Sequence, residues 1–205
     1  MDCMARRQGS DDLGPQLDRI ERDLERMEDL IGQMLALSRT EALATDLPLC
    51  PLDLIVLLRE VLRDAGVEAA DKGCSIDYQG PDSWPMRGHS ELLRRALENV
   101  LRNAIRHTPP GSRITVRARI LDEGVLVTVR DAGPGVPESQ LERIFESFVR
   151  LDEAREHEAG HGLGLAIVRA AVQAHRGRVR ARNADGGGLC VEIELPRAGP
   201  AQSAF

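Results

Sequence analysis

The sequence predicts an α+β fold in which a mixed sheet is covered by helices on one face. Two observations predict it. Apolar residues recur at helical spacing over long stretches, and later segments alternate between apolar and polar residues in pairs separated by turn residues. Helices and hairpins are interspersed and do not follow a strict β-α alternation, which favours a mixed sheet. Of the 205 residues, 42% are hydrophobic and 29% are charged. This composition is typical of globular domains and argues against extensive disorder.

The charge balance argues against a nucleic-acid partner. The chain has 33 acidic and 27 basic residues, which gives a net charge of −6, and only five of its side chains are aromatic (Trp 1, Tyr 1, Phe 3). A nucleic-acid surface usually needs a basic excess or clustered aromatic rings. The four cysteines are scattered without a Cys-x-x-Cys spacing, so a zinc site is not expected. The longest apolar run before the first strand, residues 54–58, is too short to span a bilayer, and we expect no membrane contact.

The N-terminal part predicts one long helix before the main domain. Residues 1–14 carry no periodic pattern and are expected to be disordered or derived from cloning. Residues 15–44 have an apolar stripe with alternating steps of three and four, so this helix needs a partner helix. The partner helix belongs to another chain or to the rest of this one, and we favour another chain. The stripe consists of Leu17, Ile20, Leu24, Met27, Ile31 and Met34.

Proline and glycine divide the rest of the chain. Pro48 and Pro51 predict a linker over residues 45–51. The domain is expected over 52–197, followed by a tail over 198–205. Helices are predicted over 53–71 with Asp53 as N-cap, over 90–107, over 139–145 and over 163–175. Strands are predicted over 75–79, 113–121, 125–130, 178–182 and 189–195, with a loop over 80–85 and a polar segment over 150–160.

Each boundary has a local reason. Pro109-Pro110-Gly111 ends the helix over 90–107, whose apolar residues recur on one face. Asp122-Glu123-Gly124 is typical of a hairpin turn between two alternating strands. The glycine run 186–188 predicts a second hairpin near the C-terminus.

Three groups of residues suggest chemistry. Asn99 and Asn103 are four residues apart and therefore lie one turn apart on one helix face. Amides at the edge of an apolar face need hydrogen-bond partners or a ligand, and an amide oxygen suits Mg²⁺. A purely structural role for the pair remains open.

The second group is Asp131, Gly133 and Gly135, directly after a predicted strand. A carboxylate there can accept a hydrogen bond from an exocyclic amine such as that of adenine. Glycines permit close backbone approach, although the same pattern also occurs in ordinary turns.

The third group is Gly160, Gly162 and Gly164, where a helix begins. Free N–H groups at a helix start favour phosphate. The polar segment before it contains Arg150 and Arg155 and is expected to form a lid over a nucleotide.

These motifs, in this order, resemble the N, G1, F and G2 boxes of the catalytic ATP-binding domain of sensor histidine kinases. The F box corresponds to Phe145-Glu-Ser-Phe148, and a last glycine box to Gly187-Gly188-Leu189. Met34 to Arg39 resembles the end of the second helix of the dimerisation hairpin. Residues 148–155 and 173–177 are similar to envelope-stress kinases of the Cpx type.

The resemblance implies a two-layer α/β sandwich of the Bergerat (GHKL) type, shared with Hsp90, gyrase and MutL. It also implies ATP and Mg²⁺ as cofactors. By this resemblance Asn103 binds Mg²⁺, Asn99 supports it or the phosphates, and Asp131 holds adenine beside Gly133 and Gly135. Arg106 and His107 would lie near the phosphates, and Arg150 and Arg155 would reach the γ-phosphate. The phosphate-binding residues would be Gly160, His161, Gly162, Leu163 and Gly164, with a histidine at 161 where the family usually has Ser or Thr.

One residue favours phosphoryl transfer over hydrolysis. Hydrolysing members of the superfamily have a water-activating Glu four residues before the metal-binding Asn, and Asn99 stands at that position here. An amide cannot act as a general base. Glu98 is its neighbour but points about 100° away around the helix.

The acceptor motif of the family, His-Glu-x-Arg-Thr-Pro or close to it, does not occur in this chain, and none of its five histidines fits. We therefore expect ATP binding without autophosphorylation. The expected partners are a dimerisation hairpin carrying the acceptor histidine, in a parent homodimer, and a response regulator. The expected location is the cytoplasmic part of an inner-membrane sensor. Two alternatives remain open: a nucleotide-binding regulatory module without phosphotransfer, and a serine kinase of the anti-sigma type.

Overall fold

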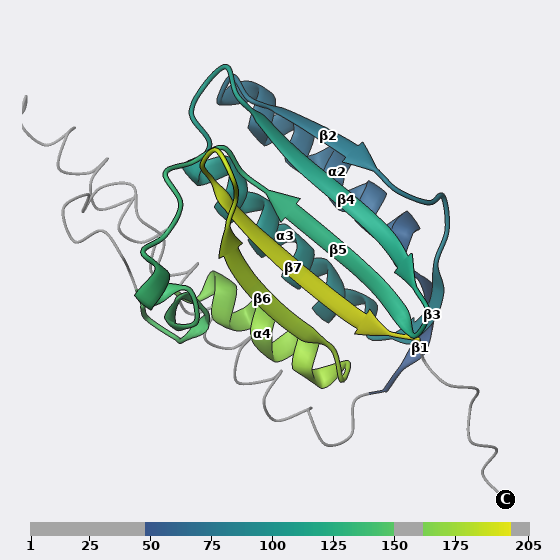
Figure 1. Cartoon of the computed structure of the whole chain (residues 1–205). Helices are drawn as coiled ribbons and strands as arrows, with labels where there is room; N and C mark the ends of the chain where they lie inside the picture. Colours follow the sequence, from purple (N-terminus) through teal and green to yellow (C-terminus); the bar gives the residue numbers. More distant parts are fainter. Residues whose placement is uncertain (1–47, 150–161, 198–205) are drawn as a thin grey trace, which may run out of the picture.

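A computed structural model describes residues 48–149 and 162–197 of the protein (Figure 1). These residues form a five-stranded sheet, a two-stranded sheet and three long helices. The helices are α2 (Leu54–Asp71), α3 (Ser90–His107) and α4 (Gly164–Ala174). The strands are β1 (Cys50–Asp53), β2 (Ser75–Gln79), β3 (Pro85–Gly88), β4 (Arg113–Leu121), β5 (Gly124–Arg130), β6 (Arg178–Asn183) and β7 (Leu189–Pro196).

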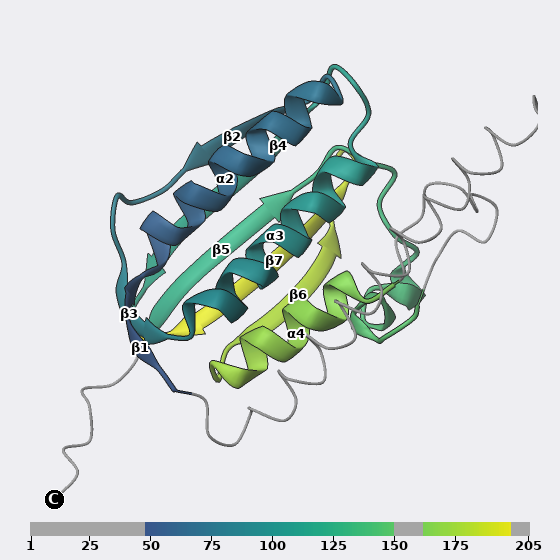
Figure 2. The same ribbon diagram turned by 180° about the vertical axis from the view of Figure 1, so that it is seen from behind.

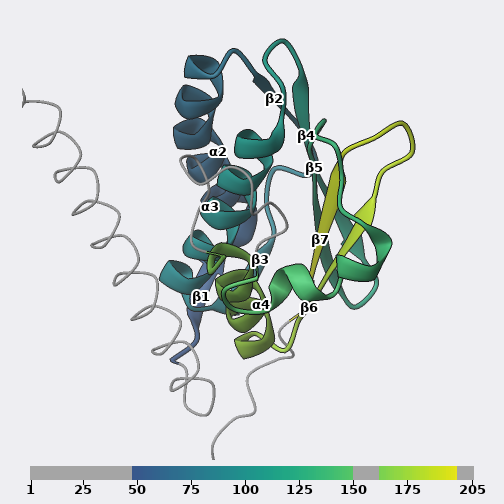
Figure 3. The ribbon, with the colours of Figure 1, turned by 90° about the vertical axis from the view of Figure 1, so that its left-hand side faces the viewer.

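The large sheet has the strand order β2-β4-β5-β7-β6. Strand β2 runs parallel to β4, and the other neighbours are antiparallel, so the sheet is mixed. All three helices lie on one face of it, as the view from behind shows (Figure 2). Seen edge-on, helices and sheet form two layers (Figure 3). The predicted α+β fold with helices on one face is confirmed.

The core lies between these two layers. Alternate residues of β4 and β5 face the helices, and Ile114, Val116 and Val125 are fully buried. The apolar face of α3 packs against them, so its helical periodicity matches the period of two in the strands. The predicted inward residues of α3 are all buried: Leu92, Leu93, Ala96, Leu97, Val100, Leu101 and Ile105.

The start of α2 is fixed by Asp53, as predicted. Its Oδ1 accepts hydrogen bonds from the backbone N–H groups of Ile55 at 2.9 Å and Val56 at 3.2 Å. The same carboxylate accepts from the N–H of Trp84 at 3.0 Å and from the hydroxyl of Ser83. Burial alone would raise the pKa of Asp53, but these hydrogen bonds outweigh it and lower the pKa below its ordinary value. Asp53 therefore joins α2 to the loop before β3.

Two short strands differ from the sequence prediction. Cys50 and Pro51, predicted as the end of the linker, belong to β1, and Pro85, predicted as loop, begins β3. The two strands pair antiparallel, from Cys50 with Gly88 to Asp53 with Pro85. Strands of four residues that contain proline have no readable alternation. Only their pairing with each other makes them strands.

The helix predicted over 139–145 is also different. The structure has two 3₁₀ turns there, Glu138–Gln140 and Arg143–Phe145. A helix this short forms too few i→i−4 hydrogen bonds to be stable without tertiary support. The chain instead turns to bury Ile144 and Phe145.

The other predicted elements are present within one or two residues of their expected ends. The predicted helix over 15–44 and the tail over 198–205 lie outside the described residues, and the domain boundaries stay predictions. Among the helices of residues 48–149 and 162–197, none combines the length and the hydrophobicity that crossing a bilayer requires.

Candidate functional site

Asn99 connects α3 to the beginning of α4. Its side-chain Nδ2 donates to the carbonyl oxygen of Arg95 at 2.8 Å, one turn earlier in the helix. Its Oδ1 faces Gly164, where a Cβ atom would lie only 2.9 Å from that oxygen. The hydrogen bond to Arg95 thus orients the amide with its oxygen toward the start of α4. The sequence predicted both residues for one site, and the structure brings them into contact.

Asn103 lies one turn further along α3 and is half-buried. Within the described part of the chain no hydrogen bond of its amide is recorded. Arg106 and His107 complete the helix, and both are exposed and held by contacts of their own. The C-terminal part of α3 therefore carries the amide of Asn103 and the side chains of Arg106 and His107.

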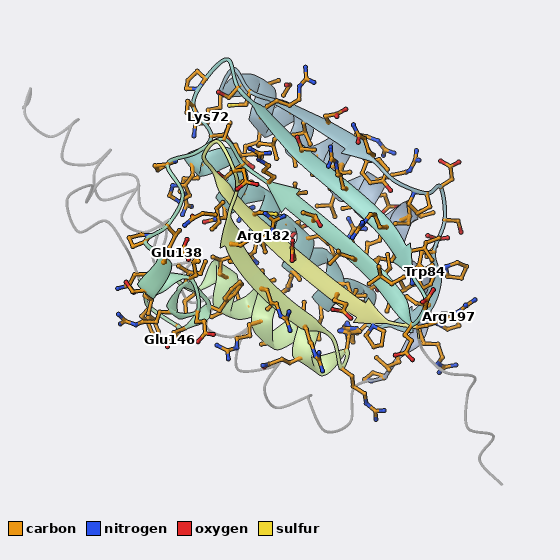
Figure 4. The ribbon with its side chains drawn as sticks, viewed as in Figure 1. Lys72, Trp84, Glu138, Glu146, Arg182 and Arg197 are labelled. Carbon is orange, nitrogen blue, oxygen red and sulfur yellow. The ribbon has the colours of Figure 1, made fainter. Side chains whose placement is uncertain are left out.

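Lys72 supports that last turn of α3. Its Nζ donates to the carbonyl oxygens of Ile105, at 2.7 Å, and of Arg106. Lys72 is the C-cap residue of α2, so the C-terminal ends of α2 and α3 lie close together (Figure 4). A cation at a helix C-terminus satisfies carbonyls that have no partner within the helix.

Asp131 follows β5 and is one of the few charged residues in the interior, with 5% of its surface exposed. Its Oδ1 accepts two backbone hydrogen bonds, from Gly133 at 2.8 Å and from Leu189 at 2.9 Å. No described residue donates to its Oδ2. One oxygen is therefore fixed by the fold, while the other keeps its capacity to accept a hydrogen bond.

The glycines around Asp131 have no room for side chains. A Cβ at Gly133 would lie 2.7 Å from the carbonyl oxygen of His107. A Cβ at Gly188 would lie 2.1 Å from the carbonyl oxygen of Asp131, and the φ of Gly188 is +92°, in the region that favours glycine. The loop after β5, the β6–β7 turn and the end of α3 are thus closely packed around this carboxylate.

Gly162 closes another part of the site. Its carbonyl oxygen accepts a hydrogen bond from the N–H of Phe148 at 2.9 Å. Both residues have positive φ, +71° for Gly162 and +66° for Phe148. The chain before residue 150 and the chain after residue 161 therefore meet next to the start of α4. Leu163, the N-cap residue of α4, is completely buried beside them.

Two residues near Asp131 were not predicted from the sequence. Thr108 is buried, and its Oγ1 accepts a hydrogen bond from Ala132 N at 3.4 Å. Asn183 holds the loop after Gly135: its Oδ1 accepts from Val136 N at 2.9 Å, and its Nδ2 donates to Val136 O at 2.7 Å. A polar residue beside a proline pair and an asparagine ending a strand are weak signals, because both are common in turns.

Three close contacts join predicted site residues to one another or to Asn183. Asn99 contacts Gly164, and Gly133 packs against His107, so α3 links the glycine start of α4 to the loop of Asp131. Gly135 lies beside Asn183 with φ +79°. Arg150, Arg155, Gly160 and His161 lie outside the described residues. Within residues 48–149 and 162–197 there is no cluster of three or more His, Cys, Asp or Glu side chains that suits a metal ion.

Comparison with known families gives the same assignment. Residues 88–199 match the family of histidine kinase-, DNA gyrase B-, and HSP90-like ATPases. This chain belongs to that ATPase family. The match covers α3 to β7 and therefore includes Asn99, Asn103, Asp131 and the glycines around them, whereas Lys72 precedes it.

Curated relatives of this ATPase family member are sensor kinases. The chain is 40% identical over 186 residues to the sensor histidine kinase CpxA of Escherichia coli K12, covering 88% of this chain and 39% of CpxA. It is 36% identical over 189 residues to the sensor histidine kinase TrcS of Mycobacterium tuberculosis, covering 88% of this chain and 37% of TrcS. The chain thus spans less than half the length of these relatives. The predicted resemblance to Cpx-type kinases is confirmed.

Solved structures agree with the fold. The mycobacterial sensor histidine kinase MprB aligns with a TM-score of 0.65 and 31% identity, covering 73% of this chain and 98% of that one. Full-length ShkA in complex with AMPPNP aligns with a TM-score of 0.76 and 31% identity, covering 91% of this chain and 39% of that one. The predicted Bergerat-type sandwich is confirmed by these matches.

Proposed function

We propose that this chain is the ATP-binding catalytic part of a two-component sensor histidine kinase. It binds Mg²⁺-ATP and positions the γ-phosphate for transfer to a histidine on a dimerisation hairpin. In that transfer the bond between the γ-phosphorus and the bridging oxygen of ADP breaks as a phosphorus–nitrogen bond to the imidazole forms. Because phosphoryl transfer depends on positioning and charge neutralisation, the chain needs no covalent chemistry of its own.

The geometry of Asp131 carries this proposal. Two backbone N–H groups hold Oδ1 at 2.8 and 2.9 Å, and Oδ2 has no donor among the described residues. An acceptor that the fold has oriented but left unpaired suits the exocyclic amine of adenine. The tightly packed Gly133 and Gly188 fix the backbone around this carboxylate.

The phosphates would lie where the start of α4 meets the middle of α3. The start of α4 at Gly164 offers N–H groups without helical partners, which favours anions. Asn99 Oδ1 lies next to this start, and Arg106 is on the last turn of α3. Arg150 and Arg155 remain predicted to reach the γ-phosphate, and Gly160 and His161 remain predicted to bind the phosphates.

The residues of α3 fit a magnesium ion that keeps most of its ligands from water and phosphate. Asn103 offers one amide oxygen with no recorded hydrogen bond, and the oriented Oδ1 of Asn99 is a second neutral oxygen. Such a sparse set suits Mg²⁺, which sheds its waters reluctantly. When bound with ATP, the ion would neutralise charge on the phosphates.

The comparisons support transfer to a protein as the outcome. The relatives are named sensor histidine kinases, and the ShkA structure is a complex with AMPPNP. AMPPNP has an imido group in place of the oxygen between the β- and γ-phosphates of ATP. The residue four positions before Asn103 is an asparagine, so this helix position supplies no general base to activate water. A response regulator and a second copy of the parent kinase are the further partners that this function implies.

Nucleotide binding is tested with AMPPNP, Mg²⁺ and calorimetry on the whole chain. The Asp131→Asn variant keeps Oδ1 as acceptor but replaces Oδ2 with an N–H donor, which repels the amine of adenine. We expect affinity to fall roughly 10- to 100-fold, the range for one hydrogen bond to a charged group. The control Asp64→Asn, on the exposed side of α2, should bind like the wild type. Equal affinity of Asp131→Asn and wild type would contradict the adenine assignment.

Phosphotransfer is tested with γ-³²P-labelled ATP and a separately prepared dimerisation hairpin that carries the acceptor histidine of CpxA. We expect acid-labile label on the hairpin and none on this chain. Acid-stable label on serine would instead indicate a serine kinase. Binding of AMPPNP without any label on the hairpin would favour a nucleotide-binding regulatory module and overturn the kinase proposal.

A further inference from the structure

The face of the five-stranded sheet that points away from the helices is rich in arginine. No helix of the described part of the chain packs on this face (Figure 3). Alternation along β4, β5 and β6 places the less exposed residues toward the helices and the others toward this side. We call this side the open face. Its arginines are Arg113, Arg117, Arg119, Arg130, Arg178, Arg180 and Arg182, and its carboxylates are Asp77, Glu192 and Glu194.

This charge pattern contrasts with the rest of the protein. The whole chain has a net charge of −6, but the open face has more than twice as many arginines as carboxylates. Long basic side chains on a solvated sheet face need no partner as such. A local excess of positive charge on a protein with a negative net charge does, however, attract anionic ligands.

The strand register gathers three of these arginines around a hollow. One row across the sheet runs from Thr115 through Arg130 and Cys190 to Arg182. The adjacent row contains Arg117 and Thr128, followed by Glu192 and Arg180. The hollow has a volume of about 230 Å³ and is lined by Thr115, Arg117, Thr128, Arg130, Arg182, Ala184, Asp185 and Cys190.

Two of the three arginines are held in place by the protein. Arg182 Nε donates to Glu192 Oε1 at 3.0 Å. The Arg182 side chain lies on the open face, over β6 and β7 (Figure 4). Arg130 NH2 donates to the carbonyl oxygen of Asp185 at 2.8 Å. A guanidinium has five N–H donors, so each of them keeps donors for a ligand. Their orientation is therefore established before anything binds.

The third arginine, Arg117, has no recorded hydrogen bond or ion pair within residues 48–149 and 162–197. It is exposed, and it lies on β4 directly opposite Thr128. The hydroxyl groups of Thr115 and Thr128 add donors at the floor of the hollow. The hollow also contains one carboxylate, Asp185, but the three guanidinium groups outnumber it. Together with the two hydroxyls they form a set of donors that matches a carboxylate, which accepts hydrogen bonds at two oxygens.

We propose that the open face is a docking surface for an acidic segment of a partner protein, with one carboxylate side chain of that segment seated between Arg117, Arg130 and Arg182. The surface lies on the opposite side of the sheet from α3 and α4, which carry Asn99 and Gly164. It is therefore separate from the proposed ATP site, and a partner can dock on it while nucleotide is bound.

The details of the face favour a protein over a nucleic acid. Asp77, Glu192 and Glu194 stand among the arginines and would repel a continuous phosphate backbone. None of the residues assigned to the face is aromatic, so bases would find no stacking partner. A protein segment with interspersed charges can pair with the arginines and avoid the three carboxylates.

Binding is tested by fluorescence anisotropy with the whole chain and a labelled 12-residue peptide of alternating Glu and Ser. The key variant is Arg117→Glu/Arg180→Glu, since both residues are exposed and neither has a recorded partner among the described residues. The control Arg63→Glu/Arg169→Glu makes the same charge change on exposed positions of α2 and α4. We expect at least a tenfold loss of peptide affinity in the first variant and less than twofold in the control.

Three results would overturn the proposal: no binding of the acidic peptide by the wild type, equal losses in both variants, or tighter binding of a 12-nucleotide single strand than of the peptide. The milder Arg117→Gln/Arg180→Gln variant avoids placing a glutamate opposite Glu192 and should still lose about threefold or more, as for one weakened ion pair. AMPPNP affinity should be the same in all variants. A loss confined to the face variants would contradict the separation from the ATP site.

Discussion

The side-chain oxygen of Asn99 lies against Gly164 so closely that a Cβ at residue 164 would be 2.9 Å from it. Asn99 is in the middle of α3, and Gly164 is the first residue of α4. The approach of the two helices at this point therefore depends on a glycine. The amide oxygen of Asn99 also points toward the start of α4, which we propose as a phosphate site.

Gly164→Ala tests this contact. The added methyl group has to displace the Asn99 amide, which is held by its hydrogen bond to Arg95. We expect AMPPNP affinity to fall and stability to drop by about 1 kcal/mol, at the low end for overpacking. The matched control is Gly66→Ala in α2, where a Cβ meets nothing within 4 Å and should stabilise the helix by roughly 0.5–1 kcal/mol. Urea denaturation followed by the single tryptophan measures both; two variants of equal stability would contradict the expectation.

Asn99→Glu tests the distinction between transfer and hydrolysis. A carboxylate at this position would place a general base beside the start of α4, where the amide oxygen now lies. General-base catalysis contributes about 10²- to 10⁴-fold when well placed, so we expect ATP hydrolysis to rise by about tenfold or more. Phosphate release is the measurement, and Asn99→Gln is the control that lengthens the side chain without adding a base. An unchanged hydrolysis rate would argue that the residue does not face the γ-phosphate.

Lys72→Met tests the support of the last turn of α3. The ammonium group donates to the carbonyl oxygens of Ile105 and Arg106, and methionine keeps the length but not the charge. We expect a loss of about 1–2 kcal/mol in stability, as for hydrogen bonds from a charged donor. We also expect weaker AMPPNP binding, because Arg106 lies on the same turn. Lys72→Arg retains a donor and should recover most of both properties; identical behaviour of the two variants would contradict the role of the cation.

His175 makes stability depend on pH. It is buried, its Nδ1 lies 2.7 Å from the carbonyl oxygen of Ala171, and its Nε2 accepts a hydrogen bond from the backbone N–H of His89 at 2.9 Å. Burial lowers the pKa of His175 from its ordinary value of 6.5 and outweighs the hydrogen bond to Ala171, which raises it. The unfolded chain therefore takes up a proton at a higher pH than the folded one. This contribution to stability is complete above pH 6.5 and is lost as pH falls toward the lowered pKa.

The measurement is the free energy of unfolding between pH 7.5 and 5. We expect a decline whose slope approaches at most about 1.4 kcal/mol per pH unit, the limit for one proton. The His175→Gln variant lacks this proton uptake and should show a flatter profile. The His89→Gln control leaves the buried imidazole in place and should keep most of the decline. Parallel profiles of wild type and His175→Gln would exclude His175 as the titrating group.

Much of the fold could be predicted from local sequence patterns. The apolar periodicity of residues 90–107 predicts α3 to the residue, and Asp53 predicts the start of α2, because both depend on interactions within one or two turns. The hairpins β4–β5 and β6–β7 follow from alternation around turn residues. Strands β1 and β3 and the 3₁₀ turns were missed, because their conformation depends on partners far away in the sequence.

The candidate site shows the same division. The motifs around Asn99, Asp131 and Gly164 are visible in the sequence because their spacing follows the chain. Thr108 and Asn183 are not, since each acts on a loop more than 20 residues away in sequence, at Ala132 and Val136.

Local sequence patterns are enough to predict the identity and length of the main helices and hairpins, and the order of the glycine and asparagine motifs. Those features depend on backbone hydrogen bonds and side-chain periodicity over short distances. Three relationships become visible only in the folded molecule: β2 pairs parallel with β4, Leu189 N donates to Asp131, and the arginines of β4, β5 and β6 share one face. These relationships arise from strand register and core packing between distant segments, which local propensity does not specify.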